Sequence, residues 1–261
     1  MSSFYYQDRY SISASSGRPV TYAVQRLILA NVIVFVAQLL IAVPLWRLGQ
    51  IELDQGASTW RPEYWFGLNP GLFRYGAVWQ VVTYMFLHGG LSHLFFNMLT
   101  LYFFGPEVER ILSTRQFFRF YILCGAVGVL ADFGLAMLNG TNVPVIGASG
   151  ATLGVVAAFA TAYPKREITL FALPIPLYAW AVAALFFLLS IMAAGGPGTA
   201  WATHAGGMVF GFLYMKAAPT VRTWFERAPK KRQKPGGDQS DPLGDAVDNI
   251  FRFDEEKRRR K

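Results

Sequence analysis

The sequence predicts an all-α, polytopic membrane protein. Of its 261 residues, 53% are hydrophobic and only 15% are charged, whereas soluble domains carry about 25% charged residues. The mean hydropathy is +0.31, and several apolar stretches reach the length of about 18 residues or more that indicates a membrane span. Cys124 is the single cysteine, which excludes an intramolecular disulfide and a cysteine-based metal cluster.

The membrane domain is expected to be residues 23–217, between an N-terminal tail, residues 1–22, and a charged C-terminal tail, residues 218–261. Its six expected helices cover approximately residues 27–45, 92–107, 117–138, 149–163, 168–193 and 200–215. The long first loop mixes Trp, Tyr and Phe with proline and glycine, so we expect short interfacial helices and turns there. A short amphipathic helix is expected at residues 243–251, where the apolar side chains fall on one face.

The fourth helix, which begins at Ser149, is too short to cross the bilayer. Its apolar run ends near Ala162, so the helix would be roughly 22 Å long at 1.5 Å per residue, against a hydrocarbon core of about 30 Å. Ser149 is therefore expected at a helix N-terminus inside the membrane, beside protein or water. The helix dipole and the free N–H groups favour developing negative charge at this position, which suits a nucleophile.

The distribution of charge predicts the orientation of the chain. The second-to-third and fourth-to-fifth loops carry basic residues, and the C-terminal tail is strongly basic, whereas the third-to-fourth and fifth-to-sixth loops carry no charge. The positive-inside rule then places both termini in the cytoplasm. We interpret the net charge of +8 as the result of basic residues that set the orientation and contact the anionic lipid bilayer. We expect no nucleic-acid partner.

This orientation brings polar residues from three helices to a similar depth in the outer half of the membrane. His93 and Asn97 lie on one face of the second helix, Ser149 begins the fourth, and His204 lies near the start of the sixth. Small residues on two helices allow close approach, so His204 can reach Ser149. The glycines expected at this contact are Gly147, Gly150 and Gly154 around the fourth helix, and Gly207 and Gly211 on the sixth.

These residue types predict nucleophilic catalysis. A serine is usually activated by a neighbouring histidine, and no carboxylate has an evident place as a third member, so a Ser149–His204 dyad is expected. The amide of Asn97, a neutral His93 and the backbone N–H of Ser149 are expected to donate to the oxyanion. No cofactor and no metal are expected, because the His-Glu-x-x-His motif of metalloproteases is absent.

Three motifs together resemble the rhomboid intramembrane serine proteases, and their order is that of the family. The motifs are Gly147-Ala148-Ser149-Gly150, His93-x-x-x-Asn97 and His204-x-x-Gly207-x-x-x-Gly211. The resemblance covers about residues 24–217 and implies a six-helix rhomboid-like bundle with a short fourth helix and an interfacial first loop. It implies that Ser149 is the nucleophile, His204 the general base, and His93 and Asn97 the oxyanion donors. It also implies transmembrane protein substrates, cut near their outer end.

Glu109 and Arg110 match the Glu and Arg that follow the second helix in the family, but two positions depart from the family pattern. Trp79-Gln80 stands where many members have Trp-Arg, and Leu153 stands where many have an aromatic residue that stacks on the catalytic histidine. The compact core without an added span is typical of prokaryotic members, which predicts an integral protein of the bacterial inner (plasma) membrane.

Simpler interpretations remain for single features. Taken alone, the glycines and the Ser149 hydroxyl can be explained by helix packing. Likewise, His93 and Asn97 can be explained as a structural hydrogen-bonded pair. Asp132 is a site candidate because carboxylates are costly in a membrane, or else a structural or solvated group, and His88 is interpreted as interfacial or water-lining. For the whole protein, the alternative is an inactive rhomboid relative that binds membrane proteins. Such relatives have typically lost the serine or the histidine.

Cysteine labelling tests the predicted topology. In a variant lacking Cys124, Ser240→Cys in the C-terminal tail should resist a membrane-impermeant maleimide in intact cells and react after lysis, because the basic tail faces the cytoplasm. Gly196→Cys, in the uncharged fifth-to-sixth loop, is the control that should react in intact cells. Ready labelling of the tail cysteine from outside would overturn the topology.

Overall fold

The computed structural model describes residues 20–47, 62–170, 173–193 and 200–227. The chain divides into two compact units, Met1–Pro219 and Thr220–Lys261. The predictions made for the N-terminal tail, for residues 48–61 of the first loop and for a helix at residues 243–251 lie outside the described residues.

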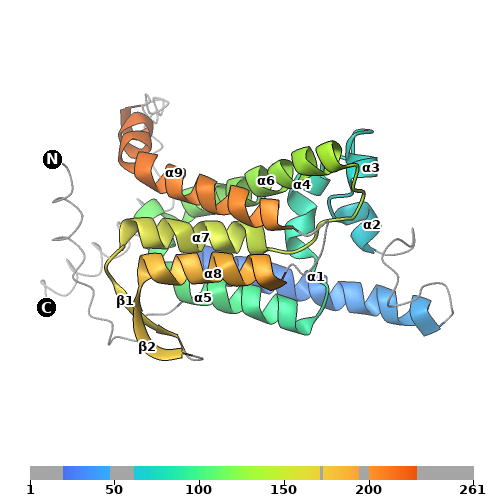
Figure 1. Ribbon diagram of the computed structural model, residues 1–261, viewed down its shortest axis with the longest axis horizontal. Coiled ribbons are helices and arrows are strands. Elements are labelled where there is room, and N and C mark those ends of the chain that lie inside the picture. The colour runs from blue at the N-terminus through green and yellow to red at the C-terminus, as the bar shows by residue number, and fades with distance from the viewer. Residues whose placement is uncertain (1–19, 48–61, 171–172, 194–199, 228–261) are drawn as a thin grey trace, which may run out of the picture. The chain divides into compact units, whose positions relative to one another are not determined.

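Long helices make up most of the described residues, as the sequence predicts (Figure 1). They are α1 (Tyr22–Arg47), α5 (Leu91–Leu112), α6 (Thr114–Asn139), α7 (Ser149–Ala162), α8 (Ala179–Ala193) and α9 (Trp201–Arg227). Two stretches within them, Tyr22–Ile41 and Thr114–Asn139, are long and apolar enough to cross a membrane, and Ser149–Ala162 and Ala179–Met192 are apolar but shorter. Several of the helices are longer than predicted, most clearly α9, which the sequence analysis ends near Met215.

The first loop contains the short helices and turns that its aromatic, proline-punctuated sequence predicts. They are α2 (Pro62–Phe66), α3 (Pro70–Phe73), α4 (Gln80–Thr83) and a 3₁₀ turn, η1 (Tyr84–Phe86). Asn69 caps α3, because its side-chain oxygen accepts from Gly71 N at 2.9 Å and Leu72 N at 3.3 Å. Pro70 follows at the first helical position, where its missing N–H removes no helical hydrogen bond.

Gln80, one of the two departures from the family pattern, holds this loop together from inside. Its side chain is fully buried. The side-chain oxygen accepts from Asn69 N at 3.0 Å, and the side-chain nitrogen donates to Trp65 O at 3.1 Å. The indole N–H of Trp79 donates to the same Trp65 carbonyl at 3.0 Å. A neutral amide therefore satisfies buried backbone groups in the loop.

Helix α7 lies among the other helices and is buried along nearly its whole length (Figure 1). Every residue from Gly150 to Ala160 is buried, and α5, α6 and α8 all pack against it. Its 14 residues correspond to a length of about 21 Å at 1.5 Å per residue. The helix is therefore shorter than the roughly 30 Å of a bilayer core, as the sequence predicts.

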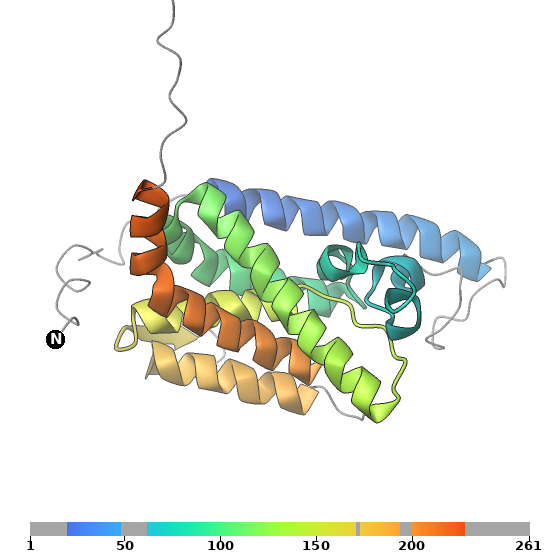
Figure 2. The same cartoon turned by 90° about the horizontal axis from the view of Figure 1, so that it is seen from above.

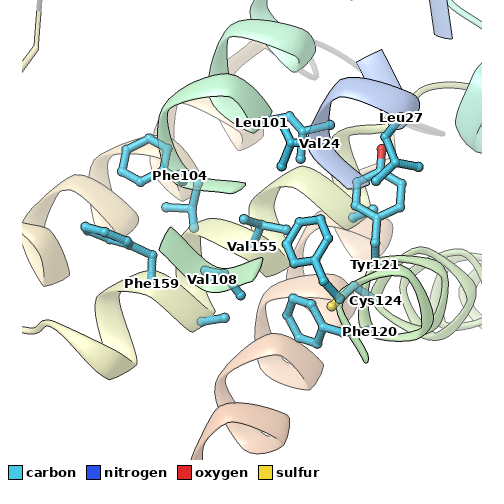
Figure 3. Packing of buried hydrophobic residues seen from close by; sticks show 14 of the residues in the cluster. Val24, Leu27, Leu101, Phe104, Val108, Phe120, Tyr121, Cys124, Val155 and Phe159 are labelled. Atoms are coloured by element: carbon cyan, nitrogen blue, oxygen red, sulfur yellow. The ribbon is translucent and has the colours of Figure 1, made fainter. Parts of the chain in front are cut away.

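Aromatic and branched side chains from α1, α5, α6 and α7 form the core around α7 (Figure 3). The rings of Phe104 and Phe159 meet edge to face, with their centroids 5.2 Å apart. Val155 and Cys124 are fully buried in the same cluster. Helix α6 supplies one side of this core and runs at an angle across the other helices (Figure 2).

Helices α7 and α9 touch backbone to backbone at glycines. A Cβ added to Gly207 would collide with the carbonyl oxygen of Gly150, and would lie 2.8 Å from its carbonyl carbon. A Cβ added to Gly211 would collide in the same way with Gly154, again 2.8 Å from the carbonyl carbon. Real Cβ atoms do not approach other atoms this closely, so only glycine fits at either position.

The fifth predicted helix begins later than expected, because a β-hairpin replaces its first part. Strand β1 (Glu167–Leu170) pairs antiparallel with β2 (Leu173–Tyr178), and α8 begins only at Ala179. The prediction of a helix from Ile168 was wrong, whereas the rest of the described chain is mostly helical, as predicted. Pro174 and Pro176 are the physical reason, since proline breaks a helix interior and is tolerated on an edge strand.

Large apolar side chains on the outside of the bundle are exposed where a membrane protein would face lipid. On α1, Leu29, Ile33 and Leu40 are 51%, 57% and 71% exposed. Phe103 on α5 and Leu188 on α8 are similarly exposed. So many exposed large apolar side chains are unusual in a soluble monomer and are expected where a protein contacts a membrane or a partner.

The glycine contact predicts a specific loss of stability. Gly211→Ala should lower the free energy of unfolding by about 1–3 kcal/mol, because the added methyl group forces the α7 and α9 backbones apart. Gly134→Ala on α6 is the matched control, since nothing lies within 4 Å of its added Cβ. Thermal unfolding in detergent measures both, and equal midpoints for the two variants would contradict the packing described.

Candidate active site

Ser149 begins α7 in a position fixed by the chain that precedes it. Val145 pairs with Leu68 of the first loop, with both N–H to O hydrogen bonds at 2.9 Å. Gly147 then turns with φ +116°, a left-handed conformation that favours glycine, and its N–H donates to Tyr84 O at 2.9 Å. Loop and turn together place the Ser149 side chain at the helix start.

The Ser149 Oγ and the His204 Nε2 lie 2.7 Å apart, within hydrogen-bonding distance. These residues are 55 positions apart in the sequence, and the contact of α7 with α9 through glycines brings them together. When the neutral imidazole carries its proton on Nδ1, the hydroxyl donates to Nε2. The structure therefore brings together the two residues that the sequence pairs.

No carboxylate occupies a third position beside His204 in the described part of the chain. The Nδ1 atom of His204 is buried and has no hydrogen-bond partner among the described residues. Asp132 is buried and accepts a hydrogen bond from the backbone of Thr203, in the first turn of α9. The carboxylate therefore supports the helix start next to His204, and of its two interpretations the structural one fits.

Leu153, the second departure from the family pattern, is buried one turn after Ser149. It lines the same cavity as His204. Among the described residues, no aromatic ring stacks on the imidazole of His204. The hydrogen bond to Ser149 is thus a polar contact that helps to orient the histidine.

His93 and Asn97 lie on the same side of α5, facing the start of α7. The Nδ2 of Asn97 donates to His93 O at 3.0 Å, and its Oδ1 accepts from Thr152 Oγ1 at 3.2 Å. The His93 ring lies against Gly147, where an added Cβ would be 2.6 Å from Cε1. Any side chain at position 147 would therefore displace His93.

One cavity connects these groups. It has a volume of about 830 Å³ and is lined by Ser149, His204, His93 and Asn97, together with other residues of α5, α7 and α8. The N–H groups of the first turn of α7 precede its intrahelical hydrogen bonds and carry the positive end of the helix dipole. The cavity therefore combines a hydroxyl, an imidazole and several hydrogen-bond donors.

Metal binding has no support in the described residues, because no three His, Cys, Asp or Glu side chains there are grouped to hold an ion.

His88 lies close to the site without lining the cavity. Its ring is 5.0 Å from that of His93, and the residue is only 2% exposed. The side chain is thus buried within the protein, and the interpretation of His88 as interfacial or water-lining stays a prediction.

Glu109 and Arg110 lie at the opposite end of α5 from His93. The Glu109 carboxylate accepts from Ala23 N at 3.1 Å and Val24 N at 3.2 Å, and also from Thr114 Oγ1 at 2.7 Å. It therefore caps the start of α1. Arg110 pairs with Glu107 at 3.1 Å. This family-like motif is a structural element away from the cavity.

Two residues near the site were not identified from the sequence. Tyr84 is fully buried and holds two elements at once, since its hydroxyl donates to Gly125 O at 2.8 Å and its carbonyl accepts from Gly147. The sequence did not indicate this role of Tyr84, because the first loop contains many other aromatic residues. Thr152 bonds to Asn97 across helices, which no local pattern indicates, because helical threonines usually bond to their own helix.

Comparison with known proteins agrees with this geometry. The family model described as the Rhomboid domain matches residues 75–218, more than half of the chain. Rhomboid protein 1, mitochondrial, of Saccharomyces cerevisiae is 33% identical over 143 residues, covering 52% of this chain and 40% of that protein. Rhomboid protease GluP of Bacillus subtilis is 28% identical over 177 residues, covering 67% and 33%.

Presenilin-associated rhomboid-like protein, mitochondrial, of Bos taurus is 27% identical over 166 residues, covering 58% of this chain and 44% of that protein. The matched part is thus less than half the length of each of these three relatives. The match to the family model begins within the first loop and therefore leaves out α1, but it includes every residue that lines the cavity. The chain belongs to the rhomboid family, with the polytopic helical membrane fold that this family implies.

Proposed function

We propose that this protein is an intramembrane serine endopeptidase that cleaves single-span membrane proteins near the outer membrane face with a Ser149–His204 dyad. The observation that carries the proposal is the 2.7 Å contact of Ser149 Oγ with His204 Nε2. This contact lies at the start of a buried helix and beside a cavity lined with further donors. Similarity to one relative named as a protease, Rhomboid protease GluP, supports the same reaction class.

In the first half of the reaction, Ser149 Oγ attacks the scissile carbonyl carbon while His204 Nε2 takes the hydroxyl proton. The carbonyl oxygen becomes an oxyanion, stabilised by donors placed in advance. As the tetrahedral intermediate collapses, the peptide C–N bond breaks and the imidazolium gives its proton to the leaving amine. The acyl group remains as an ester on Ser149.

In the second half, a water molecule attacks the ester and His204 Nε2 takes a proton from it. A second oxyanion forms and collapses, the bond to Ser149 Oγ breaks, and the proton returns to the serine. The new carboxyl terminus leaves, and the dyad is restored to its starting protonation. The cavity of about 830 Å³ is large enough for peptide side chains on either side of the scissile bond.

The proposed oxyanion donors follow from the hydrogen bonds of α5. His93 Nδ1 faces the N–H of Gly89 at 3.4 Å and therefore acts as an acceptor, which leaves the ring proton on Nε2. One hydrogen of Asn97 Nδ2 is used by His93 O, and the second is free for substrate. Together with the Ser149 N–H, these groups can donate to an oxyanion formed at the start of α7.

The membrane setting of the reaction is also part of the proposal. Residues 23–217 form the six-helix membrane domain, and the tails, residues 1–22 and 218–261, lie in the cytoplasm of a bacterium whose inner membrane holds the protein. Helix α7 is too short to reach both faces, so Ser149 lies below the outer surface. An inactive relative that only binds membrane proteins is disfavoured, because serine and histidine are both present and in contact.

Turnover of a single-span reporter in detergent tests the dyad. Ser149→Ala and His204→Ala should each abolish cleavage, and the double variant should be scarcely slower than either, because the pair acts as one unit. Ser113→Ala, which removes an exposed hydroxyl between α5 and α6, should cut at the wild-type rate. A folded Ser149→Ala protein that cuts as fast as wild type would remove Ser149 as the nucleophile.

Removal of one oxyanion donor should have a smaller effect. Asn97→Ala should lower kcat by about 10²–10³. This is the typical effect of removing one oxyanion donor from an enzyme, and it corresponds to roughly 2.7–4 kcal/mol. Redundancy with His93 and the Ser149 N–H would reduce that loss. KM should change little, because the interaction forms in the transition state. An Asn97→Ala variant with raised KM and unchanged kcat would indicate that Asn97 binds the substrate in its ground state.

A further inference from the structure

Thr152 is the polar residue nearest Ser149 on α7 that the proposed mechanism leaves without a role. It lies one turn after Ser149, it is only 2% exposed, and it lines the same cavity. Its Oγ1 lies 3.2 Å from Asn97 Oδ1 and 3.3 Å from Ser149 O. The hydroxyl therefore connects α5 with the helix that carries the nucleophile.

We propose that Thr152 is a positioning residue that fixes the orientation of the Asn97 amide toward the oxyanion. The inference rests on the proposed function, and it assigns the residue no contact with the substrate. This role follows from the hydrogen-bond partners of the Asn97 amide, because only one orientation of the amide matches its donor and its acceptor to the groups around them.

The amide of Asn97 has one end that donates and one that accepts. The carbonyl oxygen of His93, 3.0 Å away, requires the donating end to point toward α5. The reversed amide would place Oδ1 against this carbonyl, and two acceptors would face each other without a hydrogen. With the amide set this way, Oδ1 faces Thr152, and the hydroxyl donates to it and holds the amide in that orientation.

Both constraints are needed, because the contact with His93 O is made within the same helix, one turn away, and leaves the amide free to swing about its side-chain torsions. The Thr152 hydroxyl adds a second point of attachment on a different helix. Asn97 is only 6% exposed, so without the hydroxyl its Oδ1 would be a buried acceptor that has lost its partner on α7. A buried acceptor without a partner is costly and favours rotation of the amide.

The Thr152 hydroxyl has one hydrogen and two acceptors within 3.3 Å. Both distances exceed the usual 2.7–2.8 Å for O–H···O bonds, as expected of a hydrogen shared between two oxygens. The second acceptor, Ser149 O, belongs to the nucleophile itself. The same hydroxyl thus keeps the oxyanion donor of α5 in register with the serine of α7.

The first experiment compares Thr152→Val with wild type in reporter cleavage. Valine keeps the shape and removes the hydroxyl, so kcat should fall about 10- to 100-fold, less than or equal to the effect of losing the Asn97 donor itself. KM should stay within about twofold, because the interaction acts in the transition state. Thr152→Ser, which keeps the hydroxyl, should restore kcat to within a few fold of wild type.

Thr161→Val is the matched control. This threonine lies at the other end of α7, and its Oγ1 donates to Ala157 O of its own helix at 2.7 Å. The substitution is the same and removes a hydroxyl from the same helix, but it is distant from Asn97, so kcat should not change. A similar loss of kcat in both variants would mean that hydroxyl removal destabilises α7 in general, and would overturn the inference.

A double-variant cycle with Asn97→Ala separates positioning from other roles. If Thr152 acts through Asn97, Thr152→Val should cause no further loss in an Asn97→Ala background. Additive losses would show that Thr152 acts independently of Asn97 and would overturn the inference. If thermal unfolding shows that Thr152→Val is not folded, Thr152→Ala and Thr152→Ser are compared in its place. The inference then requires that only the serine variant retains the wild-type kcat.

The two proposals fail in different ways. Wild-type kcat in Thr152→Val, with cleavage still abolished by Ser149→Ala, would overturn the positioning role and leave the proposed function intact. Cleavage that persists in Ser149→Ala would overturn the proposed function and the positioning role together.

Discussion

The backbone contact between α7 and α9 is the constraint on which the rest of the site depends. Gly150 faces Gly207 and Gly154 faces Gly211, each pair so close that a single methyl group would not fit. In a membrane, helices gain no hydrophobic driving force from one another, so association depends on close packing and polar contacts between them. This packing brings the first turns of both helices together and sets Ser149 Oγ 2.7 Å from His204 Nε2.

The other elements hold the two helix starts in place. The first loop anchors the chain before α7 through Leu68 and Tyr84. The buried side chain of Gln80 forms hydrogen bonds with backbone groups of the loop. Asp132 binds the first turn of α9. The helix that carries the serine is therefore fixed at its N-terminus by polar contacts and along its length by glycine and alanine packing, which gives a preorganised site of the kind that transition-state stabilisation requires.

The sequence predicts the helices and the Ser149–His204 pair because both rest on strong local patterns: long apolar runs, and small residues at helical spacing around a serine and a histidine. It does not predict contacts between helices whose residues belong to no such pattern. Thr152 and Asp132 bond to groups on other helices, and Gln80 is buried only because the loop folds around it. The hairpin before α8 is a different case, since Pro174 and Pro176 were visible signals against a helix at that position.

The central claim is that His204 makes Ser149 a nucleophile, and covalent labelling tests it most directly. The purified protein in detergent is treated with a serine-directed fluorophosphonate, digested, and analysed by mass spectrometry beside His204→Ala and Ser149→Ala. The account predicts an adduct on Ser149 in the wild-type protein and none at this position in either variant. Equal labelling of Ser149 in the folded His204→Ala variant, or an adduct only on another residue, would contradict it.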